Sequence, residues 1–460
     1  MKALKVLDTN IILLDANNIH NLASDGSVII LPETVVNELD SFKSGHSELA
    51  YQSRSFGRLI ASATRIGKEE INDLRVIKMK TDTTEIWIVS SVSYPDMSQV
   101  DPKTINDRKI IEIAYQLLAN NDGDVTFYTN DIMCGITAEA LGLRVKELRD
   151  VENTDFVFTK ELEVSTEVFS NLHNKPILDI DSEYKFTYHN YKFTTLDSTQ
   201  VKLATITNGL VTVMGKDSER DIRRQEVNPC NSEQLLLSKA IQDPMIDIVV
   251  CDSLAGSGKD LVSISNAIRL VKTNTPYESI HYIRASVNDV PVEEEVGFLA
   301  GNEEKMAVYL HPLYDTLDFI ARQRYTKSKL KGAELEEKVD ESIEKYMKDC
   351  SITAMTALGL RGRTFHNTVA IIDESQNMSK ASLQKVLTRF GRNCKIIIIG
   401  SSNQIDNKFL TKYTNGLSVL LNACTEPQEL VTMRAVTLQK VPRGAIAEFA
   451  ENLFSVTVSE

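Results

Sequence analysis

The chain has 460 residues, 42% of them hydrophobic, and a formal net charge of −13. This length and apolar content predict two to four domains with substantial cores, and the acidic balance excludes nucleic-acid binding through overall charge alone. No stretch approaches the roughly 20 apolar residues of a membrane span. The six cysteines are scattered without a C-x-x-C pair, which argues against a disulfide framework and against a zinc site. We therefore expect a cytoplasmic protein with reduced thiols and no membrane contact.

Three regions follow one another along the chain. Over residues 1–150, short β-branched runs alternate with helical patterns, which is typical of an α/β fold with a parallel sheet. Residues 151–225 are rich in Thr, Tyr and Phe, and Asn208-Gly209 is a strong hairpin signal, so we expect a small antiparallel, β-rich connector. The α/β alternation returns over residues 226–460 and predicts a second α/β domain.

Four carboxylates stand out in the first region. Asp8 and Asp131 follow apolar strands, Asp107 opens a helix, and Glu38 lies in "PETVVNELD". Functional groups gather at the carboxyl ends of parallel strands, and a cluster of carboxylates needs a cation, for which oxygen ligands favour Mg²⁺ or Mn²⁺. Taken singly, Asp8 and Asp131 also fit turn or N-cap positions, and Glu38 and Asp107 fit solvated helix positions.

The order of these acids resembles that in the PIN domain, a family of metal-dependent ribonucleases. The stretches "LDTNIIL", "LPETVVNELD", "NDRKIIEIA" and "TND…AEALGL" match its four acidic motifs in sequence order. The resemblance implies cleavage of single-stranded RNA with the help of one or two divalent ions. The implied ligands are Asp8, Glu38, Asp107 and Asp131, with Thr129 and Asn130 as supports.

A phosphate-binding loop is predicted in "IDIVVCDSLAGSGKDLVSI", residues 246–264, between a β-branched run and a helical pattern. Its core consists of Ala255, Gly256, Ser257, Gly258 and Lys259. In such loops backbone N–H groups cradle phosphates and the lysine reaches the outer phosphates. Two positions depart from G-x-x-x-x-G-K-[S/T], because Ser253 replaces the first glycine and Asp260 replaces the hydroxyl that binds Mg²⁺. A carboxylate about 4 Å from a phosphate charge repels it by roughly 4 kcal/mol at an effective dielectric of about 20, so we expect ATP binding and leave hydrolysis open.

Further residues complete the predicted nucleotide site. Asp373 and Glu374 follow a buried strand, as expected for an acid that binds Mg²⁺ and an acid that polarises the attacking water. Gln404 follows another buried strand and suits contact with a γ-phosphate, whereas the amide of Gln234 can read the edge of adenine. The arginine candidates for nucleotide or RNA contact are Arg284, Arg361 and Arg363.

Residues 226–460 resemble the PhoH-like ATPases, a RecA-like family related to helicases. The matching stretches include "NSEQ", "AGSGK", "LRGRTFHNTVAIIDESQNM" and "LTRFGRNCKIIIIG". Arg389 and Arg443 resemble positions that reach a γ-phosphate within or across a subunit, whereas Ser401 replaces the usual aspartate. With the first domain and the connector included, nearly the whole chain resembles PIN-PhoH fusion proteins, which implies coupled RNA unwinding and cleavage in a homo-oligomeric ring.

These observations favour a metal-dependent endoribonuclease joined to an ATP-driven RNA helicase or translocase. Mg²⁺ or Mn²⁺ and ATP are the expected cofactors, and RNA is the expected partner. Two alternatives stay open. Asp260 and Ser401 also fit a PIN nuclease whose degenerate C-terminal domain serves assembly, and a third reading is a nucleotide-gated RNA-binding protein without nuclease activity.

Overall fold

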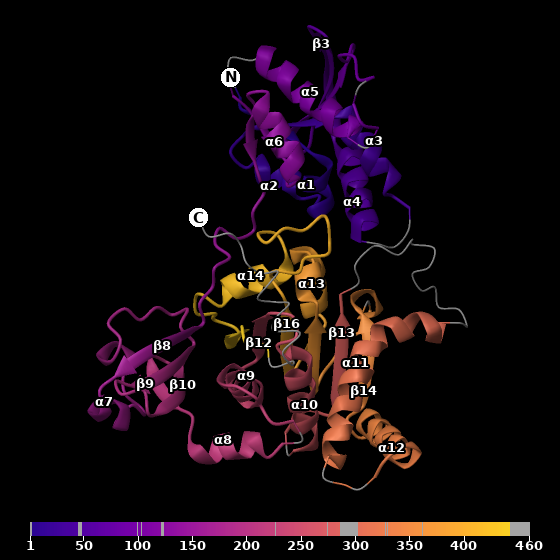
Figure 1. Ribbon diagram of the computed structural model, residues 1–460. Coiled ribbons are helices and arrows are strands. Elements are labelled where there is room, and N and C mark those ends of the chain that lie inside the picture. The colour runs from indigo at the N-terminus through magenta and orange to yellow at the C-terminus, as the bar shows by residue number, and fades with distance from the viewer. Residues whose placement is uncertain are drawn as a thin grey trace. The chain divides into compact units, whose positions relative to one another are not determined.

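The computed structural model describes residues 2–441 apart from 45–47, 99, 103, 121–123, 226, 274, 286–301, 327, 329 and 361. The chain forms two compact units, the first built mainly from residues 1–150 and the second mainly from the chain that follows Asp150 (Figure 1).

The first unit is an α/β domain around one sheet. Its strands are β1 (Leu4–Leu7), β2 (Val28–Pro32), β3 (Thr64–Ile71), β4 (Leu74–Lys80), β5 (Glu85–Ser91), β6 (Val125–Tyr128) and β7 (Arg144–Lys146). Its helices are α1 (Thr9–Leu14), α2 (Asn18–Leu22), α3 (Glu33–Ser41), α4 (Glu48–Ser62), α5 (Ile105–Asn120) and α6 (Ile132–Ala140). The strand order is β3-β4-β5-β2-β1-β6-β7.

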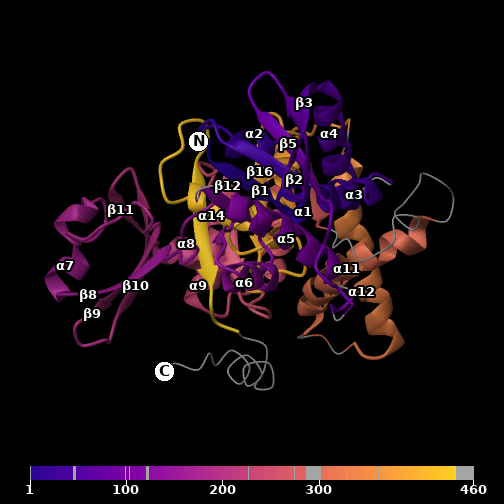
Figure 2. The same cartoon turned by 90° about the horizontal axis from the view of Figure 1, so that it is seen from above.

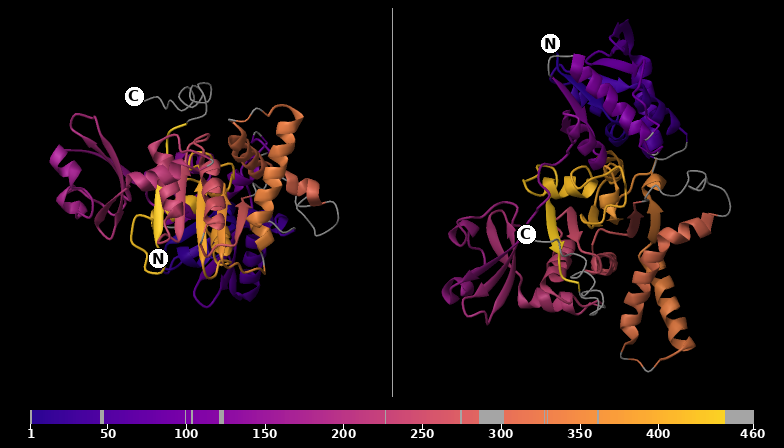
Figure 3. Two further views of the ribbon diagram at one scale, coloured as in Figure 1. Left: turned by 90° about the horizontal axis from the view of Figure 1, so that it is seen from below. Right: turned by 45° about the horizontal axis from the view of Figure 1, so that its top comes forward.

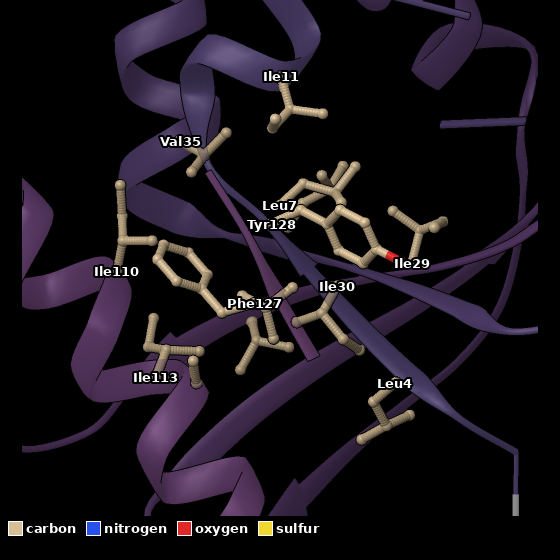
Figure 4. Close-up of a cluster of buried hydrophobic side chains, with 14 of the residues drawn as sticks. Leu4, Leu7, Ile11, Ile29, Ile30, Val35, Ile110, Ile113, Phe127 and Tyr128 are labelled. Atoms are coloured by element: carbon tan, nitrogen blue, oxygen red, sulfur yellow. The ribbon is translucent and has the colours of Figure 1, made fainter. Parts of the chain in front are cut away.

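The predicted parallel strands form one side of this sheet. β1 pairs in parallel with β2 and β6, and β5 and β7 extend the parallel part. An antiparallel β3–β4–β5 meander, which the sequence pattern did not predict, forms the other edge. Figure 4 shows the core between sheet and helices, where Phe127 of β6 lies beside Ile110 and Ile113 of α5. This packing fixes the carboxyl ends of β1 and β6, which carry Asp8 and Asp131.

The connector in the second unit has its own sheet, formed by β8 (Thr159–Val164), β9 (Asn190–Thr195), β10 (Val201–Thr207) and β11 (Leu210–Val213) (Figure 2). The predicted hairpin is confirmed, since Asn208 and Gly209 both have positive φ, 51° and 74°, and join β10 to β11. The prediction of a wholly antiparallel connector is wrong, because β8 pairs in parallel with β9. The chain between these strands crosses over through α7 (Thr166–Ser170) and the 3₁₀ turn Ile177–Asp179 and so enters β9 in the direction of β8.

The remainder of the second unit is built on a fully parallel sheet of order β14-β13-β15-β16-β12-β17. Its strands are β12 (Ile248–Ser253), β13 (Ser279–Arg284), β14 (Ile352–Thr356), β15 (Thr368–Asp373), β16 (Cys394–Gly400) and β17 (Met433–Leu438). Its helices are α8 (Lys216–Arg223), α9 (Ser232–Gln242), α10 (Lys259–Lys272), α11 (Asn302–Tyr325), α12 (Ala333–Asp349), α13 (Lys380–Leu387) and α14 (Gly416–Ala423). The paired helices α11 and α12 are seen best in Figure 3.

Both faces of this sheet are covered, which explains the continuous apolar runs of its strands. Val249 and Cys251 of β12 belong to the apolar cluster that includes residues of α9 and α10, whereas Val250 belongs to the cluster that includes residues of α13 and α14. Because every strand runs the same way, the carboxyl ends of β12, β13, β15 and β16 meet at one edge. Arg284 and Asp373 are the last residues of β13 and β15, and Glu374 and the phosphate loop follow the ends of β15 and β12.

Candidate nuclease and nucleotide sites

Asp8 is held at the end of β1 by three neutral donors. Its Oδ1 accepts from the backbone N–H of Thr9 at 2.6 Å, so that Asp8 caps α1. Its Oδ2 accepts from Asn10 Nδ2 at 2.6 Å and from Thr129 Oγ1 at 2.7 Å. The support implied for Thr129 is therefore present as a direct hydrogen bond. Asn10 was not singled out from the sequence, although it lies two residues after Asp8.

The other three acids line the same pocket as Asp8. Glu38 of α3 accepts from the hydroxyl of Thr9 and, at 2.8 Å, from Asn106 Nδ2. Asp131 caps α6 through the backbone N–H groups of residues 133 and 134, and Asp107 lies in the first turn of α5. The structure thus gives Asp8 and Asp131 the helix caps of the simpler interpretation and also brings all four acids together.

Burial, and after it the repulsion between the acids, raises pKa values in this pocket. Burial raises the pKa of Asp8 to about 6, an effect that hydrogen bonds from Thr129 and Thr9 oppose and the charges of Asp107 and Glu38 reinforce. The pKa of Asp107 is also raised, by burial and then by the charges of Asp131 and Glu38. Four such oxygen donors suit a hard divalent cation. Within the described part of the chain, no group of three or more acidic, His or Cys side chains is already arranged to hold an ion.

Asn130 supports the neighbouring loop and not an acid directly. Its Oδ1 accepts from the backbone N–H of Leu148 at 2.8 Å, and its own N–H donates to Asn10 Oδ1 at 3.1 Å. Asn130 therefore fixes the chain that leads into Asp131.

The predicted phosphate loop has the expected strand-loop-helix context, with β12 ending at Ser253 and α10 beginning at Lys259. Gly256 and Gly258 have positive φ, 78° and 85°. A Cβ on Gly258 would lie 2.9 Å from Gln234 Nε2, so a side chain is excluded on both grounds. α10 begins at Lys259, and the N–H groups at the start of a helix provide the favourable potential for phosphate that this motif requires.

Gln234 supports this loop from the start of α9. Its side chain is 4% exposed. Its Nε2 donates to Ser257 O at 2.8 Å, and its Oε1 accepts from the N–H of Cys230 at 2.8 Å. A contact with adenine therefore requires Gln234 to give up or share these bonds, and its predicted adenine role stays a prediction.

Five charged side chains meet at the carboxyl edge of the sheet. Lys259 Nζ lies 3.2 Å from Asp260 Oδ2, 3.5 Å from Glu374 Oε1 and 4.0 Å from Asp373 Oδ1. The guanidinium of Arg284 lies 3.7 Å from Asp373 and 3.9 Å from Glu374. The register that pairs Arg284 with Asp373 across β13 and β15 explains this approach.

The pKa values follow from these contacts. Burial lowers the pKa of Lys259, but the charges of Asp260, Asp373 and Glu374 outweigh burial, so its pKa lies above the usual value. The pKa of Asp373 is raised, by burial first and then by the charge of Asp260. The hydroxyl of Tyr282 donates to Asp373 Oδ2 at 2.5 Å, a partner that sequence reasoning missed. The lysine is thus a firmly protonated group, as a ligand of phosphate must be.

The three departures from the family pattern have different surroundings. Ser253 donates its buried hydroxyl to Gly400 O at 2.9 Å, so this replacement is accommodated. Ser401 is buried and its N–H donates to Gln376 Oε1 at 3.1 Å. Asp260 differs, since its Oδ1 is buried and accepts no hydrogen bond from the part of the chain that the structure describes. Asp260 therefore remains the unusual feature of the site.

The remaining candidates are less closely tied to this edge. Gln404 is exposed, and its backbone carbonyl accepts from Gln376 Nε2 at 2.9 Å. Arg389 Nε donates to Lys385 O at 3.3 Å, and the guanidinium of Arg363 lies over the ring of Phe365. Arg361 and Arg443 lie outside the described residues.

Comparison with protein families identifies both halves of the chain. A model described as "PIN domain" matches residues 5–149, and a model described as "PhoH-like protein" matches residues 226–455. The chain is therefore a fusion of a nuclease-type PIN domain with an ATPase-type P-loop domain. It belongs to the PhoH-like protein family, as the resemblance in its sequence predicted. Domains of these two classes generally use a divalent metal ion and ATP.

Similar proteins align with this chain over nearly their whole length. "Protein PhoH2" of Bacillus subtilis is 25% identical, with 98% of this chain and 100% of the relative aligned. "Protein PhoH2" of Thermobispora bispora is 23% identical, with 98% and 97% aligned, and that of Mycolicibacterium smegmatis is 22% identical, with 96% and 94% aligned. A solved domain of a functionally unknown protein from Methanocaldococcus jannaschii matches with a TM-score of only 0.22, at 17% identity over 33% of this chain and 95% of its own. Among the described residues, no helix is long and apolar enough to cross a membrane.

Proposed function

We propose that this protein is a metal-dependent endoribonuclease coupled to an ATP-driven RNA helicase or translocase. The observation that carries the proposal is the convergence of Lys259 with Asp373 and Glu374 in the same chain as a pocket lined by four carboxylates. Lys259, which lies between the acid that follows the phosphate loop and the acids at a strand end, suits a nucleotide. In the other pocket four carboxylates outnumber the one lysine, Lys408, among the described lining residues, and this excess of negative charge suits metal-assisted hydrolysis.

In the nuclease pocket, Asp8, Glu38, Asp107 and Asp131 hold one or two divalent ions, Mg²⁺ or Mn²⁺. A bound ion supplies activation of water and stabilisation of the charge that develops on the phosphodiester. Thr129 and Asn10 keep the Asp8 carboxylate turned into the pocket through their hydrogen bonds. Single-stranded RNA is the proposed substrate, because the resemblance to PIN-domain ribonucleases implies it and the pocket is lined by the four acids that this resemblance names.

In the nucleotide site, Lys259 binds the outer phosphates, Asp373 binds Mg²⁺ and Glu374 orients the attacking water. Gln404 contacts the γ-phosphate, and Arg284 balances the charges of Asp373 and Glu374 until nucleotide arrives. The other residues that we propose to bind the nucleotide are those of the loop from Ala255 to Gly258, together with Asp260, Gln234 and Arg443. Subunits assemble in a homo-oligomeric ring, in which an arginine of one copy reaches the nucleotide of the next.

Both activities are tested on one purified preparation. RNase activity on end-labelled single-stranded RNA is measured with Mg²⁺, with Mn²⁺ and with chelator, and ATPase activity is measured with and without RNA. Light scattering with ATP and RNA present measures assembly. RNA that stays uncut with either metal refutes the nuclease, absence of ATP hydrolysis with and without RNA refutes the ATPase, and a strict monomer refutes the ring.

A second candidate is a PIN nuclease whose C-terminal domain binds nucleotide or assembles without turnover. The ion pair between Asp260 and Lys259 favours this second candidate, because Asp260 competes with phosphate for the amine of Lys259. RNA cleavage that proceeds without any ATP hydrolysis, in a protein that is still oligomeric, distinguishes this candidate from the first.

A further inference from the structure

Gln376 joins the Asp373-Glu374 pair to the loop of residues 400–406. Its side chain is fully buried, three residues after Asp373. Its Nε2 donates to Glu374 Oε2 at 2.6 Å and to Gln404 O at 2.9 Å, and its Oε1 accepts from the N–H of Ser401 at 3.1 Å. Both amide N–H groups and the amide oxygen are thus used, and each has a partner in the nucleotide site or in the loop beside it.

The Gln376 amide packs closely against the backbone at the end of β16. A Cβ on Gly400 would lie 2.5 Å from Gln376 Oε1, so only glycine lets the amide lie against the end of β16. Glu374 has a φ of 55°, a left-handed conformation that a non-glycine residue adopts only where its surroundings hold it. Gln376 donates a hydrogen bond to one oxygen of the Glu374 carboxylate, and Lys259 lies close to the other, so both contacts restrain Glu374 in this conformation.

The loop of residues 400–406 is also anchored on its other side. Asp252, at the end of the strand that precedes the phosphate loop, accepts from the N–H of Ser402 at 2.9 Å and from its hydroxyl at 2.8 Å. Asn377 Oδ1 accepts from the N–H of Asp406 at 2.9 Å. The loop is therefore hydrogen-bonded both to Asp252, before the phosphate loop, and to the turn that follows Asp373. Of these hydrogen-bonded side chains, Gln376 is the one that also binds the Glu374 carboxylate.

We infer that Gln376 is a positioning residue that orients the Glu374 carboxylate and couples it to the loop carrying Gln404. The inference rests on the proposed ATPase function and deepens it. An amide N–H fixed on Oε2 leaves Oε1 to face the nucleotide, so the orientation of the carboxylate depends on Gln376. Since the same amide holds Ser401 and Gln404, a shift of Glu374 on nucleotide binding moves the loop, and a shift of the loop moves Glu374.

The test compares three full-length variants. Gln376→Leu removes donor and acceptor, whereas Gln376→Glu keeps an acceptor for Ser401 but places a second carboxylate against Glu374. Ser375→Ala is the matched control, because Ser375 is equally buried and ties the same turn to Ile399 O at 3.0 Å without a bond to Glu374. We expect both Gln376 variants to lose about 10- to 100-fold in kcat for ATP, with KM changed by less than about threefold. Ser375→Ala should keep kcat even if its melting temperature falls.

Hydrogen exchange supplies a readout that does not depend on turnover. In the wild-type protein, ATP with Mg²⁺ should slow amide exchange across residues 400–406. Both Gln376 variants should bind ATP and lose that slowing, and Ser375→Ala should retain it. A Gln376 variant that keeps both kcat and the nucleotide-dependent protection overturns the inference while the ATPase proposal stands. Wild-type protein that binds no ATP overturns the ATPase proposal itself, and the inference with it.

Discussion

Replacement of Asp260 by threonine tests whether this carboxylate limits the nucleotide site. Asp260 Oδ2 lies 3.2 Å from Lys259 Nζ, closer than Glu374 at 3.5 Å or Asp373 at 4.0 Å. The side chains of Lys259 and Asp260 are 16% and 26% exposed, so water screens their interaction only in part. Asp260 is therefore the nearest competitor for the amine that we expect to bind phosphate.

The magnitude follows from Coulomb's law. Two unit charges at 3.2 Å attract by about 5 kcal/mol at an effective dielectric of 20, and a phosphate charge about 4 Å from the Asp260 carboxylate meets a repulsion of roughly 4 kcal/mol. Mg²⁺ and water offset much of both effects. A remainder of only about 1.4 kcal/mol corresponds to a tenfold change in affinity or rate. We therefore expect Asp260→Thr to tighten ATP binding by about tenfold or more and to raise Mg²⁺-dependent hydrolysis.

The assay combines calorimetric titration of ATP with steady-state ATPase rates across a Mg²⁺ titration. Asp260→Asn separates the two parts of the effect, because it removes the charge without supplying a hydroxyl for Mg²⁺. Asp217→Asn is the matched control, since the side chain of Asp217 is 97% exposed on α8. It should leave both affinity and rate unchanged.

One result refutes the electrostatic reasoning. If Asp260→Thr leaves both binding and hydrolysis unchanged or weaker at every Mg²⁺ concentration, Asp260 does not obstruct the site. Unchanged values would mean that the carboxylate has no effect on the site, whereas weaker binding or hydrolysis would mean that it takes part in holding the cation.

Three further predictions concern other parts of the chain. Asp8→Asn should lower RNA cleavage by orders of magnitude and abolish thermal stabilisation by Mg²⁺ without nucleotide. Differential scanning fluorimetry in chelator should show little loss of stability, because removal of a buried charge offsets the loss of the Oδ2 acceptor for Asn10 and Thr129; wild-type RNase rates would contradict the prediction. Lys259→Ala should abolish thermal stabilisation by ATP, whereas Glu374→Gln should keep it and lose hydrolysis, so equal stabilisation of wild type and Lys259→Ala rules out this site. Burial lowers the pKa of Lys395 from its usual 10.5 to about 8. Between these pH values the unfolded chain binds more protons than the folded protein, so the free energy of unfolding rises with pH. Denaturant unfolding should show this free energy increasing by up to about 3 kcal/mol in wild type relative to Lys395→Met as pH rises from 8 to 10.5. A difference between the two proteins that stays constant with pH would disprove the pKa shift.

The central parallel strands were predictable because burial on both faces gives continuous β-branched runs, as in β12 and β16. β3 carried no such signal, since all but the last of its eight side chains are exposed and no alternation marks it. β14 lies at the edge of its sheet and carries a weaker signal, since only two of its five side chains are buried. The parallel pairing of β8 with β9 depends on the crossover between them and not on the local pattern of either strand.

Among the proposed site residues, sequence motifs predicted those in the phosphate loop and the Asp373-Glu374 pair, which the structure brings within 4.0 Å of Lys259. They did not find Tyr282, because its bond to Asp373 depends on the register of β13 against β15. Gln376 stands beside the acidic pair in "DESQN", but its partners Ser401 and Gln404 come from another strand end. Such partners become visible only when the strand order is known.

The two acidic sites handle the same electrostatic problem in different ways. Among the described residues, the hydrogen bonds that Asp8, Glu38 and Asp131 accept come from neutral donors. Lys408 also lines this pocket, but one lysine does not balance four carboxylates, so the pocket favours an external cation. In the nucleotide site, Lys259 and Arg284 already balance two of three carboxylates. A free divalent ion should therefore bind the first site more strongly, whereas the second site should take its ion together with a nucleotide whose phosphates draw Lys259 away from the acids. This difference is why stabilisation by Mg²⁺ alone should depend on Asp8, and stabilisation by ATP on Lys259.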